Sequence, residues 1–258
     1  MGPTGLQEGE ESVKSYTRRI PRNKTVELNE NSNALDKFNH TFYRVAQELT
    51  PWGFIRGRAI RRELLLRGKA FTFRVYFRCN GASTLKFGVY VNIFSDRLAQ
   101  WHRENYADTN HQLEAGNVLT LPLRALVDGG ESERFDVTFE VERERVIRSI
   151  VDQVTEGLYP FLERFEEGLI GLVDQVAREG FAPQAGFVTN LNFLLCFGNA
   201  KKAQQGMENF LRAMPEYRAL YEEYRREDPL NFMISKGEYG LMIKEILYNH
   251  IEIDFTQL

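Results

Sequence analysis

Cysteine is scarce in this chain: only Cys79 and Cys196 occur among 258 residues, and they lie far apart in the sequence. This excludes a disulfide framework and a zinc site built on paired cysteines. The first thirty residues also lack the apolar segment of a secretory signal, and no apolar run approaches the roughly 18 residues that would span a bilayer. The sequence therefore predicts a cytoplasmic protein with reduced thiols and no membrane contact.

Motifs of common catalytic sites are missing as well. There is no GxSxG nucleophile motif, no P-loop and no GxGxxG fingerprint. The densest polar segment, 101–117, contains His102, Glu104, Asp108 and His111, but a spacing of nine residues between the histidines matches no compact pair of helical ligands. We interpret it as an ordinary polar loop, and we predict no catalytic residue, no metal and no cofactor.

The composition that remains is that of a globular protein. Hydrophobic residues make up 43% of the chain and aromatic residues 12%, which is enough for a packed core. Residues 1–32 are polar and rich in glycine at their start, so we predict a flexible tail there. We expect residues 33–178 to form an α+β domain and residues 179–258 a helical extension packed on it.

Hydrophobic periodicity predicts one helix and then a sheet. The helix begins at Ser32 or Asn33, either of which is a suitable N-cap, and ends at Pro51 and Gly53. Apolar and polar residues then alternate, which is typical of strands. The predicted strands lie within 70–80 and 84–94, joined by a hairpin loop. A less regular strand is predicted within 54–66, and a further strand at 134–143.

From Glu144 onward the apolar spacing becomes that of helices, and Pro160 should begin a new helix or kink a long one. Further helices are predicted at 186–197, 200–213, 216–226 and 238–250. Strands and helices are thus segregated along the chain. The predicted class is α+β, with an N-terminal helix, an antiparallel sheet of about four strands and a C-terminal helical bundle.

Charge is distributed unevenly, although the net charge is only −3. Residues 51–100 sum to +8 and residues 101–200 to −9. Within 54–79, seven arginines and one lysine stand against a single glutamate. Either the basic and acidic blocks neutralise each other in the fold, or each faces its own partner.

The basic block supplies the candidate binding residues, because arginine suits planar recognition of carboxylate or phosphate and tyrosine can stack on bases. They are Arg56, Arg58, Arg61, Arg62, Arg67, Arg74, Arg78, Tyr76 and Tyr90. The competing interpretation is structural. If the strands share one sheet, Asp136 and Glu140 would sit across from Arg74 and Arg78 and neutralise them. Those same carboxylates lack the lysine that a magnesium-dependent nuclease strand would carry.

The first half of the chain resembles an uncharacterised bacterial family, domain of unknown function 4304. The resemblance covers about residues 33–165 and rests on Gly53, Phe54, Gly57, Arg58, Arg62, Phe87 and Val89. Some members of that family are associated with immunity genes beside bacterial toxins. The resemblance therefore implies a binding protein, and it transfers no catalytic residue.

Two functional hypotheses follow. The first is a non-enzymatic protein-binding module, of the kind of an immunity protein that acts by covering an acidic or basic surface of its partner. The second is a nucleic-acid-binding protein that places the arginines of 54–79 on phosphates, with binding that falls steeply as salt rises.

Overall fold

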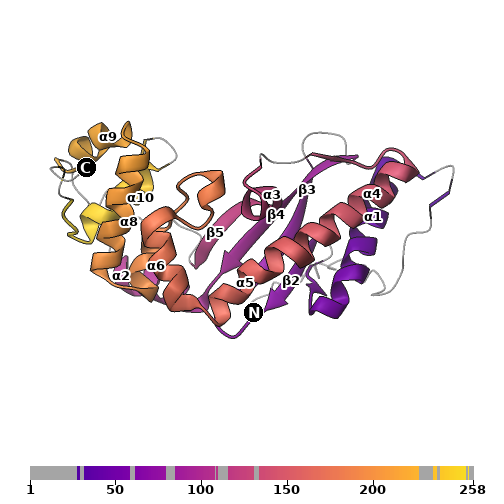
Figure 1. Ribbon diagram of the computed structural model, residues 1–258, viewed down its shortest axis with the longest axis horizontal. Helices are drawn as coiled ribbons and strands as arrows, with labels where there is room; N and C mark the ends of the chain where they lie inside the picture. The colour runs from indigo at the N-terminus through magenta and orange to yellow at the C-terminus, as the bar shows by residue number, and fades with distance from the viewer. Residues whose placement is uncertain are drawn as a thin grey trace, which may run out of the picture.

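A long helical rod crosses one face of an antiparallel sheet in the computed structural model of this protein (Figure 1). The rod consists of α4 (Glu140–Asp152), a π-helical segment (Gln153–Leu158) and α5 (Tyr159–Glu166). The structure describes residues 28–29, 32–58, 62–79, 85–107, 109, 116–130, 134–226, 235–236, 239–253 and 255. The predicted tail, 1–32, lies almost wholly outside these residues.

The sheet contains six strands within the described residues, in the order β1-β2-β3-β4-β5, with β6 paired to one end of β4. Every pairing is antiparallel. The strands are β1 (Ile55–Arg56), β2 (Glu63–Arg67), β3 (Thr72–Cys79), β4 (Lys86–Phe94), β5 (Asn117–Pro122) and β6 (Phe135–Asp136). The predicted α+β class, with a helix, then a sheet, then helices, is confirmed.

Helix α1 (Ala34–Leu49) precedes the sheet and begins where the sequence predicts. Asn33 is its N-cap, and a reciprocal hydrogen bond with Asp36 completes a capping box. The remaining described helices are α2 (Asp96–Asn105), α3 (Leu123–Val127), α6 (Leu169–Glu179), α7 (Leu191–Phe197), α8 (Ala200–Ala213), α9 (Tyr217–Tyr224) and α10 (Gly240–Tyr248), with short 3-10 turns at Thr50–Trp52 and Pro183–Ala185. In Figure 1 the helices from α6 onward gather at the end of the molecule away from α1.

The strand predicted at 134–143 is wrong over most of its length. Only Phe135 and Asp136 pair with β4, and α4 begins at Glu140. Acidic residues in the first turn favour a helix start, and the stripe of Val146, Ile147 and Ile150 extends this helix along its buried face. Phe139, which alternation would place in the core, is 69% exposed.

Two further differences concern the sheet. The strand expected within 54–66 is two strands, β1 and β2, so the chain turns between them rather than running straight. Strand β5 was not predicted, because the six residues of Asn117–Pro122 are too short to show a clear alternation and follow a polar segment.

Aromatic side chains fix the helices to one face of the sheet. Phe38 of α1 meets Phe87 of β4 at 5.0 Å between ring centroids, and Phe42 meets Phe77 at 5.2 Å. Phe165 of α5 meets Phe71 and Phe73 at the other end of β3. A single cluster of buried hydrophobic residues runs from Phe38 to Ile253. It contains side chains from both sides of the domain boundary predicted at 178/179, and that boundary stays a prediction. Within the described residues, no helix has the length and apolarity that crossing a membrane requires.

Candidate functional site

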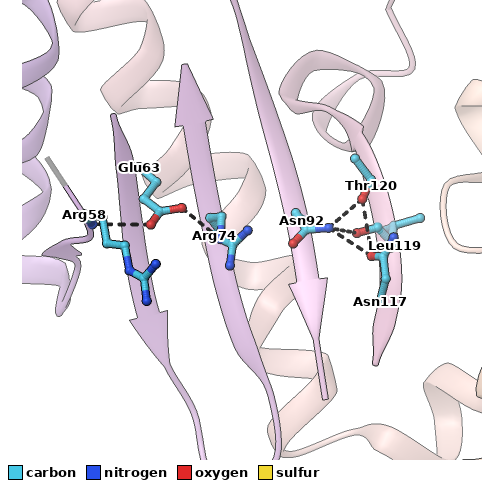
Figure 2. Close-up of polar contacts among 7 residues, drawn as sticks. All are labelled: Arg58, Glu63, Arg74, Asn92, Asn117, Leu119 and Thr120. Carbon is cyan, nitrogen blue, oxygen red and sulfur yellow. Dashed lines mark hydrogen bonds and ion pairs between the residues drawn. The ribbon is translucent and has the colours of Figure 1, made fainter. Parts of the chain in front are cut away.

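The sheet has a second face, formed by the side chains that alternate with the core residues. Its central row is fixed by the strand register, in which Leu65, Arg74, Asn92 and Thr120 are successive partners from β2 to β5. Leu65, Tyr76, Tyr90 and Phe94 on this side are neither in the core cluster nor packed against it. We call this side the open face and define it by Ile55, Glu63, Leu65, Arg67, Thr72, Arg74, Tyr76, Arg78, Tyr90, Asn92, Phe94 and Thr120, with Arg58 beside β2. Figure 2 shows Arg58, Glu63, Arg74, Asn92 and Thr120 of this set.

The predicted arginines do not all lie on the open face. Arg56 stacks on the ring of Tyr43, with its guanidinium carbon 5.3 Å from the ring centroid, and Arg62 lies 5.1 Å from that of Phe38. Arg62 also donates from Nε to the side-chain oxygen of Asn39 at 2.9 Å. Arg56 and Arg62 therefore pack against helix α1 and are not part of the open face. The predicted site residue Arg61 lies outside the described residues.

Arg74 is on the open face, but its counter-ion is not the one suggested by the sequence. Its Nε lies 3.1 Å from Oε2 of Glu63, the lone acid of the basic block. The alternative pairing with Asp136 is wrong, because β6 joins β4 at Lys86 and Phe87, and Asp136 pairs with Lys86 at 3.7 Å. Two hydrogen bonds from Thr138 are the largest cause that lowers the pKa of Asp136, with Lys86 a smaller one.

Glu63 is nearly buried, although it belongs to the open face. Its Oε1 accepts a hydrogen bond from the backbone N–H of Arg58 at 3.3 Å, while Oε2 faces Arg74. The side chain lies tightly against Gly57, where an added Cβ would come within 2.4 Å of its Cγ. A single carboxylate thus holds the turn after β1 and an arginine of β3 together.

Asn92 is the buried polar residue of β4. Its side-chain nitrogen donates to Asn117 Oδ1 at 2.9 Å and to Thr120 Oγ1 at 2.6 Å, which ties β4 to β5 (Figure 2). Its Oδ1 has no hydrogen-bond partner among the described residues. Together, Glu63 and Asn92 make a polar layer beneath the surface of the open face.

Tyr76 and Tyr90 are direct partners on β3 and β4, and their rings are nearly parallel, with centroids 5.5 Å apart. The Tyr90 ring lies over Gly88, where an added Cβ would be 2.9 Å from the ring. Glycine at this position therefore leaves room for the ring to cover the strand. The predicted tyrosine pair is brought together by the structure.

Three arginines remain exposed at the margins of this face: Arg58, Arg67 and Arg78. None of them forms an ion pair with another residue in the described ranges. Arg67 and Arg78 stand near opposite ends of β3, since Arg67 is the partner of Thr72. The face thus has half-buried aromatic and aliphatic side chains in its middle and positive charge at its edges.

The cysteine and histidine candidates form no reactive site within the described part of the chain. Burial raises the pKa of the Cys79 thiol more than Arg62 lowers it, so the arginines do not activate this cysteine. His102 is buried in α2, 4.8 Å from the Tyr106 ring, while Asp108 and His111 lie outside the described residues. Within the described part of the chain, no cluster of three histidine, cysteine or acidic side chains is placed to hold a metal.

A buried polar cluster joins α2, α7 and α10. The Tyr106 hydroxyl donates to Asn192 Oδ1 at 2.8 Å, and Asn192 donates to Glu245 Oε1 at 2.8 Å. Burial first, and then the negative charge of Glu245, raise the pKa of Tyr106 far above its usual range. This cluster docks the C-terminal helix and was not predicted, because its members are separated by dozens of residues in the sequence.

Tyr106 is expected to make stability fall at alkaline pH. The hydroxyl ionises near pH 10 in the unfolded chain but stays protonated in the folded one, so above about pH 10 the unfolded state binds fewer protons and gains in relative stability. We expect the free energy of unfolding to decline with pH above this value, and to decline less steeply in Tyr106→Phe. Urea titrations at a series of pH values from neutral to alkaline would measure both slopes; equal slopes would contradict the assignment.

Comparisons of the chain with family models, curated proteins and solved structures gave no match. The resemblance to domain of unknown function 4304 therefore stays a prediction. Four residues of the site were not predicted from the sequence: Glu63, Asn92, Ile55 and Leu65. The signal was present for Glu63, the only acid among eight basic residues, and for Asn92, a lone amide between apolar neighbours.

Proposed function

We propose that this protein is a non-enzymatic binding module that uses the open face of its sheet to bind an acidic surface of a protein partner. The observation that carries the proposal is the arrangement of an apolar and aromatic centre with an arginine margin. Ile55 is 52% exposed, and its register partner Leu65 lies beside Arg74. Protein interfaces typically have such an apolar centre and polar rim, and are enriched in tyrosine and arginine.

The buried layer supports a binding role because it makes the face rigid. Arg74 is held by Glu63 and by the Phe94 ring, 4.9 Å from its guanidinium carbon. A surface ordered before binding loses less conformational entropy when the partner docks. Cys79 and Cys196 are free thiols, which is compatible with a cytoplasmic setting. The family resemblance adds the narrower proposal of an immunity protein that occludes a toxin.

A second candidate function is the binding of single-stranded nucleic acid. It is favoured by the nearly parallel rings of Tyr76 and Tyr90 on a sheet surface, with Arg58 and Arg78 nearby. Rings on a sheet can stack on bases while arginines contact phosphates. The aliphatic side chains of Ile55 and Leu65, which no base would require, make it the weaker candidate.

Selection of displayed random peptides on the full chain tests the proposal. We expect the selected peptides to combine acidic with aromatic or aliphatic residues, and to lose about tenfold or more in affinity for Arg58→Ala/Arg67→Ala/Arg78→Ala, since hot-spot and steering charges are removed together. The matched control is Arg103→Ala/Arg145→Ala/Arg148→Ala, which removes the same charge from exposed positions on α2 and α4 and should bind normally.

Labelled single-stranded DNA and RNA, titrated over a series of salt concentrations, form the second arm. Salt-steep binding that is lost in the open-face variant but kept in the control would favour the nucleic-acid function. Peptide binding that is equal in both variants would contradict the proposed site.

A further inference from the structure

Arg74 is an unusual arginine because it is largely buried and yet makes no directional hydrogen bond. Its side chain is 28% exposed. A guanidinium has five N–H donors, and none of those on Arg74 donates in good geometry to a residue that the structure describes. Its Nε is within ion-pair distance of Glu63 at 3.1 Å, but the angle is not that of a hydrogen bond. Among the nitrogens of this guanidinium, only Nε is buried and costly to leave unsatisfied, whereas the terminal N–H groups can meet an acceptor from outside.

Arg58 stands next to this group. Its backbone is fixed by the hydrogen bond to Glu63, and its guanidinium lies over β2 on the same side of the sheet as Arg74 (Figure 2). No described residue accepts a hydrogen bond from this guanidinium either. The Glu63 carboxylate therefore orients two arginines: it holds Arg58 by the arginine's backbone N–H and Arg74 by the arginine's side chain.

The local charge does not balance. Two guanidinium groups, those of Arg58 and Arg74, lie on this side of the sheet beside one carboxylate. The buried Glu63 contacts the side chain of Arg74 but only the backbone of Arg58, so the solvent-facing donors of the two guanidinium groups have no described counter-ion. One further oxyanion with two acceptor oxygens would neutralise the excess charge and accept from both arginines. Leu65 on β2 is the register partner of both Arg74 and Ile55, so an apolar group beside the oxyanion would also be buried.

We propose that Arg58 and Arg74 form an anion-binding subsite of the open face and bind one carboxylate of an aspartate or glutamate side chain of the protein partner. This inference rests on the proposed function and adds the position and chemistry of the main contact. Glu63 is a positioning residue of this subsite, whereas Arg67 and Arg78 act as general positive charge at its margins.

Charge-preserving substitutions test the subsite, with labelled capped hexaglutamate as the probe for the full chain. Lysine keeps the charge but lacks the planar fork, so we expect Arg58→Lys and Arg74→Lys each to weaken binding by about tenfold. Arg103→Lys and Arg145→Lys, at exposed positions on α2 and α4 outside the open face, are the matched controls and should leave the affinity unchanged. Fluorescence anisotropy gives the affinities, and thermal unfolding shows whether Arg74→Lys is folded.

Arginine Nε–Hε signals of the wild-type chain in NMR titrations provide a measurement that needs no variant. Saturable shifts confined to Arg58 and Arg74 support the subsite. Even shifts across Arg58, Arg67, Arg74 and Arg78 would overturn it while leaving the open face as the binding surface. If none of these four signals shifts, both proposals are overturned. If hexathymidylate shifts the Arg58 and Arg74 signals more than hexaglutamate does, the subsite binds a nucleic-acid phosphate and the carboxylate proposal is overturned.

Discussion

Phe165→Ala is expected to lower the free energy of unfolding by about 3–5 kcal/mol, the range for removing a large aromatic side chain from a well-packed core. Phe165 is almost wholly buried on α5. It contacts Phe71, just before β3, and Phe73 of β3 on one side, and Phe181 and Phe193 of the C-terminal helical region on the other. Its removal leaves a cavity where sheet and helices meet, and the rings around it cannot all move to fill the space.

Denaturant titration would measure this loss, provided that the slope of the transition is unchanged. Phe139→Ala is the matched control because it removes the same side chain from a position that is 69% exposed, and it should change stability by less than about 0.5 kcal/mol. Similar losses in both variants would show that Phe165 does not link sheet and helices as the structure indicates.

Glu63→Ala is expected to destabilise the chain by about 2–4 kcal/mol, because breaking a buried ion pair leaves the partner charge uncompensated. The variant removes the counter-ion of Arg74 and the acceptor for the Arg58 backbone N–H. The expected loss in the free energy of unfolding is smaller than the largest losses known for fully buried ion pairs, since the Arg74 side chain is 28% exposed and water can solvate part of its charge.

Glu63→Gln separates the two contributions. The amide keeps the shape and one acceptor oxygen but loses the charge, so about half of the destabilisation should remain. A double-mutant cycle with Arg74→Ala would measure the coupling between the two side chains. A coupling energy near zero would mean that Glu63 stabilises the fold only through the turn that carries Arg58.

The order of elements was predictable because it depends on local patterns. Strand β3 shows apolar and polar alternation along its whole length, and α8 begins and ends at the predicted residues, Ala200 and Ala213. The error at 134–143 came from the same source. Phe135, Val137, Phe139 and Val141 alternate as in a strand, but helix α4 starts within that run, and the helical stripe that follows determines the fold there.

The sequence by itself determined the α+β class, the start of α1 at Ser32 or Asn33 and the common side of Arg74, Tyr76 and Arg78 on β3, because each depends on residues close together along the chain. The tertiary structure decided the partners. Arg56 and Arg62 turn to rings of α1, and Arg74 pairs with Glu63 rather than Asp136. Such pairings depend on which strands are neighbours and in what register, and a side chain's periodicity carries no information about the element that packs against it.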